Sequence, residues 1–252
     1  MNYDVFKNKN VLITGSSSGI GNVIGKKFLE NKSNVIFTGR GKLKDNFIQN
    51  KNKYKYFKGD LTIEKTIDEL YKFVLKNFTS NLDILICNLG GGKIENKTKY
   101  TKKEWYNSFN LNFFSTVLII QKLHSLLKNS SSPSIVCISS ICGNSAIGCP
   151  ITYSVAKAAL NNYVKNYSKL IGKENIRINS ISPGNIMFQG STWEDKLEKY
   201  PEEISSYIEN NVPLNMFGSP LHIADLVLFL SSPLSNFTTG ANFVLDGGQS
   251  NV

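Results

Sequence analysis

A serine, a tyrosine and a lysine lie in the run SSICGNSAIGCPITYSVAKAAL at spacings that could support proton transfer. Ser140 ends an apolar segment typical of a buried strand, and Tyr153 begins a segment typical of a helix. Tyr153 and Lys157 are four residues apart, so a helix would present both on one face. Because a nearby ammonium favours a phenolate, we expect Lys157 to lower the pKa of Tyr153 from its ordinary value of about 10. The Ser140 hydroxyl could hold a carbonyl or carbinol oxygen. The three side chains would then form a proton relay for the interconversion of C=O and CH–OH.

A glycine-rich turn follows the first apolar segment of the chain, residues 10–14. It reads GSSSGIG from Gly15 to Gly21 and leads into a segment with helical periodicity. A strand, turn and helix of this kind can place backbone N–H groups and the positive end of a helix against a pyrophosphate. The spacing differs from that of a Walker loop, which ends in Gly-Lys-Ser or Gly-Lys-Thr. Each pattern alone has a simpler explanation, because Tyr-x-x-x-Lys is common helix spacing and glycine with serine makes ordinary turns.

The second apolar segment, residues 34–38, ends at Gly39 and Arg40, where a dinucleotide-binding fold reads the adenosine ribose. An acidic residue there would bind a 2′-hydroxyl, whereas the Arg40 guanidinium suits a 2′-phosphate. We therefore expect NADP(H) in preference to NAD(H), the alternative being that Arg40 is a solvated loop residue. Asp60, after a third strand, could accept a hydrogen bond from an adenine amino group or cap the following helix.

The composition bounds the class of protein. The chain has 252 residues, of which 41% are hydrophobic, and a formal net charge of +10, which is typical of a globular protein. No apolar run reaches the roughly 20 residues that span a bilayer, and the N-terminus is too polar for a signal peptide. No basic cluster or RNA-recognition signature accompanies the charge. We therefore expect neither a membrane nor a nucleic-acid partner.

The cysteines suggest a reducing environment. Four are present, and they include no Cys-x-x-Cys pair; they are Cys87, Cys137, Cys142 and Cys149. With only two histidines in the chain, no metal site is expected. Cys87 and Cys137 lie within apolar segments and are expected to be buried thiols. The pattern favours a reduced, cytoplasmic setting.

Strand-like and helix-like segments alternate along the whole chain, with no repeat or linker. The alternation predicts an α/β fold: a single Rossmann-type, doubly wound parallel sheet of about seven strands with helices on both faces. We expect one domain over residues 1–252, with a substrate lid around residues 187–215. Residues 41–53 are predicted to be a loop with a short helix, and residues 101–127 one long helix. Asn112 lies among apolar residues of that long helix, where a polar side chain usually has a specific hydrogen-bonding role.

Together, these motifs resemble those of the short-chain dehydrogenase/reductase family, in the family's order and over nearly the full length. Residues 14–21 are similar to its cofactor turn, and residues 87–90 (Cys-Asn-Leu-Gly) to its Asn-Asn-Ala-Gly motif. The catalytic residues that the resemblance implies are Asn112, Ser140, Tyr153 and Lys157. The expected substrate-binding residues are Ser140, Tyr153 and Phe188, the last at a position where the family often has threonine. The expected cofactor-binding residues are Gly15, Ser17, Ser18, Gly19, Ile20, Gly21, Arg40, Asp60, Leu61, Asn88, Gly90, Tyr153, Lys157, Pro183, Gly184 and Ile186.

The resemblance implies an NAD(P)(H)-dependent oxidoreductase, similar to 3-oxoacyl-[acyl-carrier-protein] reductases. NADPH would reduce a ketone, either a 3-oxoacyl thioester or another carbonyl, to a secondary alcohol, with Tyr153 as general acid and Lys157 and Asn112 in the proton relay. The partner would be a small-molecule or acyl-carrier-bound carbonyl substrate. A sugar, polyol or other secondary-alcohol dehydrogenase is an open alternative, and a non-catalytic dinucleotide-binding sensor is a further one. The end of the chain, residues 240–248, resembles the last strand of the family, which usually lies in an oligomer interface. The resemblance therefore implies a homodimer or homotetramer.

Overall fold

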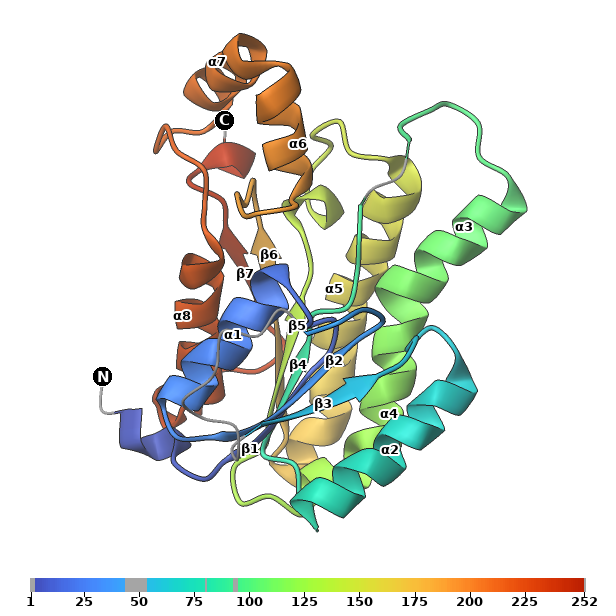
Figure 1. Cartoon of the computed structure of the whole chain (residues 1–252), viewed down its shortest axis with the longest axis vertical. Helices are drawn as coiled ribbons and strands as arrows, with labels where there is room; N and C mark the ends of the chain where they lie inside the picture. Colours follow the sequence, from blue (N-terminus) through green and yellow to red (C-terminus); the bar gives the residue numbers. More distant parts are fainter. Residues whose placement is uncertain (1–2, 44–53, 80, 93–94, 252) are drawn as a thin grey trace.

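Seven parallel strands form one sheet in the computed structural model, which describes residues 3–43, 54–79, 81–92 and 95–251 (Figure 1). The strands are β1 (Asn10–Ile13), β2 (Asn34–Gly39), β3 (Tyr54–Lys58), β4 (Ile84–Cys87), β5 (Ser134–Ile138), β6 (Arg177–Pro183) and β7 (Asn242–Leu245). Their order in the sheet is β3-β2-β1-β4-β5-β6-β7, and every neighbouring pair is parallel. The predicted doubly wound parallel sheet is therefore confirmed.

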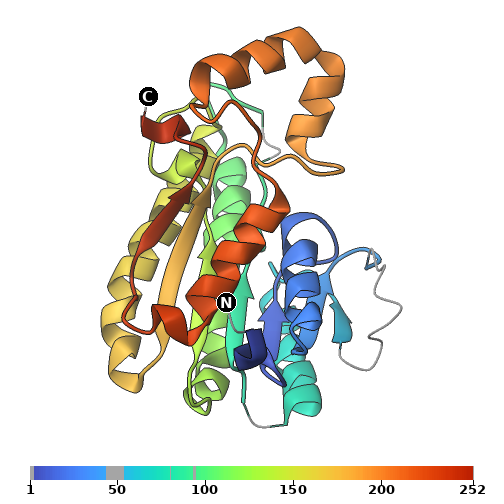
Figure 2. The ribbon, with the colours of Figure 1, turned by 90° about the vertical axis from the view of Figure 1, so that its left-hand side faces the viewer.

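Helices cover both faces of this sheet (Figure 2). The helices are α1 (Gly19–Glu30), α2 (Glu64–Phe78), α3 (Lys102–Phe109), α4 (Ser115–Lys128), α5 (Ile151–Ile171), α6 (Thr192–Lys199), α7 (Pro201–Asn211) and α8 (Pro220–Ser231). Short helical turns are η1 (Tyr3–Phe6), η3 (Asn110–Phe114), η4 (Ile141–Gly143), η5 (Gly172–Glu174), η6 (Pro233–Ser235) and η7 (Gln249–Asn251). Phe28 of α1 and Val227 of α8 belong to one buried apolar cluster, and Leu123 of α4 and Leu160 of α5 to the other. None of the helices in the described part of the chain is both long and apolar enough to cross a membrane.

The strand order changes direction between β1 and β4, because β1 pairs with β2 on one side and β4 on the other. In doubly wound sheets, ligands bind beyond the carboxyl ends of the strands at such a point. The glycine turn follows β1, Asn88 follows β4, Ser140 follows β5 and Gly184 follows β6. The topology therefore gathers the predicted site residues along one edge, which we call the carboxyl edge, and α6 and α7 lie over it (Figure 1).

The helix predicted over residues 101–127 consists of three consecutive elements. α3 begins with a capping box between Thr101 and Glu104, and it leads into η3, a π-helical turn that continues into α4. Such π turns interrupt α-helices, frequently at functional sites. Here the π turn carries Asn112, whose side chain is fully buried. The short helix predicted within residues 41–53 falls mostly outside the described residues.

Candidate active site

The glycine turn after β1 is fastened to the end of β4. The Thr14 Oγ1 accepts hydrogen bonds from the backbone N–H groups of Asn88 and Leu89, each at 3.0 Å. The Asn88 Nδ2 donates to the Gly15 carbonyl at 2.8 Å. Gly15 has φ of +60°, and a Cβ there would lie 2.9 Å from the Leu89 Cα, so only glycine fits. The Cys-Asn-Leu-Gly variant of the motif thus holds the turn tightly against β4.

The N-terminus of α1 is formed by the last residues of the glycine turn, because the helix begins at Gly19. The Ser18 side chain makes no capping hydrogen bond within the described part of the chain, so it does not compete for the N–H groups of the first turn. A Cβ on Gly21 would lie 2.5 Å from Asn88 Nδ2, which leaves no room for a side chain. Ile20 packs on the apolar cluster beneath α1. The Phe188 ring lies against Gly19, where a Cβ would be 2.8 Å from its Cε2. Phe188, predicted to bind substrate, therefore contacts the cofactor turn.

The end of β2 carries the residues predicted to read the adenosine ribose. The Arg40 Nη1 lies 3.9 Å from Asp60 Oδ2, and the Arg40 side chain is 75% exposed. The Asp60 Oδ1 accepts hydrogen bonds from the backbone N–H of Thr62 at 3.0 Å and from its hydroxyl at 2.7 Å. Burial alone would raise the pKa of Asp60, but these hydrogen bonds and the Arg40 charge leave it lowered. Asp60 thus belongs to the turn before α2 and is a counter-charge to Arg40, while Leu61 beside it is buried.

Tyr56 on β3 completes this end of the site and was not identified from the sequence. Its hydroxyl donates to the Gly41 carbonyl at 2.6 Å, and its interaction with the Ser17 side chain lowers the pKa of Tyr56, although burial raises it overall. A Cβ on Gly39 would lie 2.9 Å from that hydroxyl. The parallel pairing of Tyr56 with Phe37 brings it beside the end of β2, and a sequence pattern does not reveal which strands pair.

Asn112 and Lys157 meet at the glycine segment that follows β4. The Asn112 Oδ1 accepts from the Gly91 N–H at 2.9 Å, and its Nδ2 donates to the carbonyls of Gly91 at 3.2 Å and Ser108 at 3.0 Å. A Cβ on Gly90 would lie 2.9 Å from Asn112 Oδ1 and 3.1 Å from Lys157 Nζ. Both side chains are buried. The backbone at Gly90 therefore passes between the amide and the ammonium, and only a residue without a side chain fits there.

The Ser140 Oγ accepts a hydrogen bond from the Cys142 N–H at 3.2 Å, which fixes the serine side chain. Burial raises the pKa of Tyr153, and the interaction of its phenol with the Ser140 side chain offsets part of that rise. The phenol is therefore protonated at neutral pH.

Lys157 is buried beside this pair. Its ammonium donates to the Ile138 carbonyl at 2.8 Å and lies 5.8 Å from the centre of the Tyr153 ring. Burial lowers the pKa of Lys157 to about 8, and the interactions with Cys137 and Cys87 act in the opposite direction. The prediction that Lys157 lowers the pKa of Tyr153 is wrong for this structure, because burial of the phenol dominates and the ammonium is hydrogen-bonded to Ile138.

Pro183 is the last residue of β6, and the turn that follows it is packed against the end of β7. The Gly184 N–H donates to the Leu245 carbonyl at 3.0 Å, and a Cβ on Gly184 would lie 2.7 Å from Asp246 Cβ. Ile186 is buried and forms an isolated parallel bridge with Gly218. Next to them, the Asn185 Nδ2 is buried without a hydrogen-bond partner in the described residues. Because buried donors are normally hydrogen-bonded, this amide is suited to donate to an acceptor on a bound ligand.

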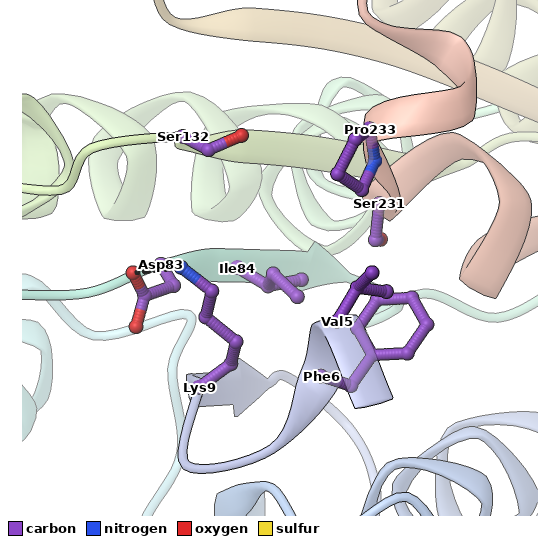
Figure 3. A pocket seen from close by; sticks show the side chains of 8 residues that line it. All are labelled: Val5, Phe6, Lys9, Asp83, Ile84, Ser132, Ser231 and Pro233. Atoms are coloured by element: carbon purple, nitrogen blue, oxygen red, sulfur yellow. Dashed lines mark hydrogen bonds and ion pairs between the residues drawn. The ribbon is translucent and has the colours of Figure 1, made fainter. Parts of the chain in front are cut away.

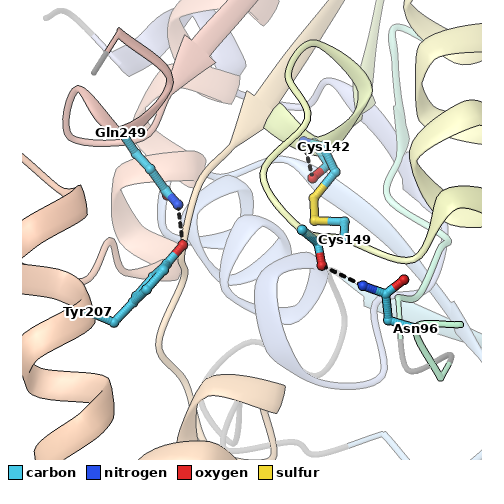
Figure 4. Close-up of a disulfide and its surroundings, with 7 residues drawn as sticks. Asn96, Cys142, Cys149, Tyr207 and Gln249 are labelled. Atoms are coloured by element: carbon cyan, nitrogen blue, oxygen red, sulfur yellow. Dashed lines mark hydrogen bonds between the residues drawn. A yellow bond between two sulfur atoms is a disulfide. The ribbon is translucent and has the colours of Figure 1, made fainter.

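The segment predicted as a lid, residues 187–215, contains α6 and α7. Trp193 of α6 stacks on Tyr207 of α7 with ring centres 5.6 Å apart, and it also packs on Phe217 at 5.6 Å. The Tyr207 hydroxyl accepts from Gln249 Nε2 at 2.8 Å (Figure 4). The Gln249 Oε1 lies 3.2 Å from the place of a Cβ on Gly184. Gln249, which sequence reasoning missed, thus links α7 to the turn after β6.

The cysteines form two pairs of different character. Cys87 and Cys137 are buried thiols, as predicted. Cys142 and Cys149 are joined by a disulfide in the loop between Ser140 and Tyr153 (Figure 4), so the expectation of reduced cysteines is wrong for this pair. The loop brings their Cα atoms to 6.0 Å, a separation that a disulfide spans. In the described ranges, no group of three or more His, Cys, Asp or Glu side chains could hold a metal ion.

A small cavity lies at the opposite edge of the sheet, near the amino ends of β1 and β4 (Figure 3). Its volume is about 70 Å³, and it is lined by Val5, Phe6, Lys9, Asp83, Ile84, Ser132, Ser231 and Pro233. The Asp83 carboxylate there accepts hydrogen bonds from Lys9 Nζ, the Asn10 N–H and the Ser130 hydroxyl. These contacts tie loops together, and the cavity is separate from the carboxyl edge.

The residues along the carboxyl edge fit a nicotinamide dinucleotide. The N-terminus of α1 and the glycine turn present backbone N–H groups suited to a pyrophosphate. Arg40 places a cation at the end of β2, where the adenosine half would lie, and Asn185 places a buried amide donor in the turn after β6. The Phe188 ring lies against Gly19 and narrows the approach to the N-terminus of α1.

Comparison with known proteins shows the same architecture. A family profile described as "Enoyl-(Acyl carrier protein) reductase" matches residues 15–250. The isoepoxydon dehydrogenase patN of Penicillium expansum is 29% identical over 96% of this chain and 95% of its own length. The 3-oxoacyl-[acyl-carrier-protein] reductase FabG of Aquifex aeolicus (strain VF5) is 30% identical over 94% of this chain and 96% of its own. A solved 7α-hydroxysteroid dehydrogenase, complexed with NADH and 7-oxo glycochenodeoxycholic acid, has a TM-score of 0.89 at 25% identity, covering 100% of this chain and 99% of that one.

Proposed function

The chain belongs to the short-chain dehydrogenase/reductase family, and from that premise we propose that it reduces a ketone, such as a 3-oxoacyl thioester, to a secondary alcohol with NADPH. As a member of the family it is an oxidoreductase that acts on CH–OH groups. The observation that carries the proposal is the grouping of Ser140, Tyr153 and Lys157: the serine side chain interacts with the phenol, and the Lys157 ammonium lies 5.8 Å from the centre of the same ring. These groups combine a proton donor, an oxygen ligand and a cation in one place, where Ser140 and Lys157 are buried and Tyr153 is half-buried.

The cofactor is assigned to the carboxyl edge of the sheet. Residues 15–21 and the N-terminus of α1 would bind the pyrophosphate, and Arg40 the 2′-phosphate. Residues 88–90 and 183–186 would border the nicotinamide half, with Asn185 as a donor to it. Bound there, NADPH supplies the hydride.

Tyr153 is the proposed general acid. Because burial raises its pKa, the phenol holds its proton at neutral pH and can give it to a carbonyl oxygen, which suits the direction of reduction. The Ser140 hydroxyl, fixed by the Cys142 N–H, would hold the same oxygen. Lys157, with a pKa of about 8, can exchange a proton near neutral pH and so restore the one that Tyr153 gives up. Asn112 positions Lys157 indirectly, through the backbone of Gly90 and Gly91.

Further parts of the proposal concern the setting. NADP(H) is favoured over NAD(H) because Arg40 follows a glycine where an acid would read a 2′-hydroxyl. The net charge of +10 suits an acidic carrier that presents an acyl chain. We also propose that the protein is a single domain with a lid at residues 187–215. It would be cytoplasmic and would form a homodimer or homotetramer. Light scattering on the purified protein would measure the oligomeric state.

A sugar, polyol or other secondary-alcohol substrate is the second candidate. Trp193 and Tyr207 of the lid segment stack on each other over the carboxyl edge and would shape the pocket that accepts such a substrate. Both candidates share the chemistry at Ser140 and Tyr153 and differ only in what the lid segment accepts.

A substrate panel tests the proposal. Ketones, 3-oxoacyl thioesters and keto sugars would be mixed with NADPH or NADH, and the loss of reduced-cofactor absorbance would be followed. We expect turnover of a ketone or 3-oxoacyl thioester, faster with NADPH. Turnover confined to keto sugars would favour the second candidate, and no turnover of any carbonyl despite NADPH binding would refute the reductase.

A further inference from the structure

The disulfide lies inside the connection between the two hydroxyl groups of the proposed site. Cys142 and Cys149 are seven residues apart, and both fall between Ser140 and Tyr153 (Figure 4). The bond therefore closes a small ring that has Ser140 just before it and the start of α5 just after it.

At its first end the ring fixes the serine. Ser140 is the N-cap of η4, where its Oγ accepts from the Cys142 N–H at 3.2 Å and its carbonyl accepts from the Gly143 N–H at 3.0 Å. A Cβ on Gly143 would lie 2.7 Å from the Lys157 carbonyl carbon, so η4 packs directly on α5 beside the lysine. The position of the Cys142 backbone thus sets the orientation of the Ser140 hydroxyl.

At its second end the ring fixes the start of α5. Cys149 precedes Pro150, whose carbonyl accepts from the N–H groups of Tyr153 at 3.1 Å and Ser154 at 3.0 Å. The neighbouring Gly148 carbonyl accepts from Asn96 Nδ2 at 3.0 Å (Figure 4). The covalent bond therefore connects the serine turn to the first turn of the tyrosine helix.

The four cysteines differ in access to solvent. Cys142 and Cys149 are half-buried, whereas Cys87 and Cys137 are 1% and 0% exposed. Thiol–disulfide exchange requires a sulfur that a small thiolate can reach. Only the first pair meets that condition among the described cysteines, and the second is an internal control.

We propose that Cys142 and Cys149 are a redox-active dithiol site that exchanges with small thiols and disulfides, and that its oxidised form holds Ser140 for catalysis. The catalytic part rests on the function proposed above. In the exchange a small thiolate attacks one sulfur, the Cys142–Cys149 bond breaks, and a mixed disulfide forms. A second small thiol then resolves it, so two small thiols are oxidised to one small disulfide while the protein gains two thiols.

The test places the full-length protein in buffers of reduced and oxidised glutathione at set ratios. Native alkylation followed by mass measurement counts accessible thiols, which should change from zero to two as the buffer becomes reducing, with Cys87 and Cys137 alkylated only after denaturation. Hydrogen exchange should show the Cys142 amide about tenfold less protected in the reduced protein, because the turn opens more often. With the best ketone of the panel, reduction should lower kcat about fivefold, as expected for loss of one positioning hydrogen bond, and leave the Kd for NADPH unchanged.

A double variant, Cys142→Ser with Cys149→Ser, is the matched control. It should have the kcat of the reduced protein and no response to the glutathione ratio. Two native-accessible thiols that persist in excess oxidised glutathione would overturn the dithiol site. Equal protection of the Cys142 amide in both forms, or a redox response that survives in the double variant, would overturn the link to Ser140. The thiol count and hydrogen exchange need no substrate, so they decide the inference even where the reductase proposal fails.

Discussion

Gly90 is the point at which a single methyl group should disturb the proposed proton relay. A Cβ at this residue would lie 2.9 Å from Asn112 Oδ1 and 3.1 Å from Lys157 Nζ, both shorter than an ordinary contact with carbon. In Gly90→Ala, one or both side chains must therefore move. Gly91→Ala is the matched control, because its Cβ would meet only Leu111 Cδ2 at 3.7 Å, an ordinary distance.

The magnitude follows from the contacts that would be lost. Displaced side chains would weaken the hydrogen bond between Asn112 and the Gly91 N–H and the one between Lys157 and the Ile138 carbonyl. A net hydrogen bond contributes about 1 kcal/mol, or up to about 3 kcal/mol where a charged group is involved, so together we expect a loss of about 2–3 kcal/mol. If the loss falls on the transition state, kcat/KM drops roughly 30- to 150-fold.

Three measurements on each alanine variant separate the causes: kcat/KM with the best ketone, the Kd for NADPH by fluorescence, and the thermal unfolding midpoint. Gly90→Ala should lose activity by the stated factor while still folding and binding NADPH, and Gly91→Ala should stay within about twofold of the parent, as expected for an unstrained change. Equal activity of the two variants, or a Gly90→Ala protein as active as the parent, would refute the reasoning.

Three further variants test other contacts. Asp60→Asn removes the counter-charge 3.9 Å from Arg40, so the ratio of NADH to NADPH dissociation constants should rise, by up to about fivefold for an exposed pair, and an unchanged ratio would contradict the role of Arg40. Phe188→Thr removes the ring from Gly19 and should tighten NADPH binding, whereas weaker binding would show that the ring holds the cofactor. Lys157 has a pKa of about 8 when folded against 10.5 for an ordinary lysine, so the unfolded state binds more protons between these values. The free energy of unfolding should therefore rise by about 3 kcal/mol from pH 8 to 10.5 relative to Lys157→Met, and parallel pH profiles for the two proteins would exclude a buried ammonium.

The sheet could be predicted because the buried strands β1, β2, β4 and β5 are short and largely apolar runs. The observed strand ends differ from the predicted ones where backbone or side-chain groups form hydrogen bonds outside the sheet. β4 begins at Ile84 although the sequence has an apolar residue already at Leu82, since the Leu82 N–H donates to the Leu126 carbonyl in α4. The strand expected to reach Ser140 ends at Ile138, because Ser140 caps η4.

Features that depend on residues distant in sequence could not be predicted. The sequence marks Asn112 as a polar residue in an apolar helix. The π turn that carries it and its hydrogen bond with the Gly91 N–H become apparent only in the folded structure. The effect of Lys157 on Tyr153 cannot be predicted from their helical spacing, because that spacing does not show the burial of the phenol or the hydrogen bond from Lys157 to the Ile138 carbonyl. Tyr56 reaches Ser17 only through the pairing of β2 with β3.

The central claim is that the Tyr153 phenol gives its proton to the substrate oxygen, and Tyr153→Phe measures it most directly. The variant keeps the ring and removes only the hydroxyl. With the ketone that the parent reduces fastest, we predict that kcat falls by about 10²- to 10⁴-fold, the contribution of a general acid, while the Kd for NADPH stays the same. A Tyr153→Phe protein that reduces the ketone at the parent rate would contradict the account.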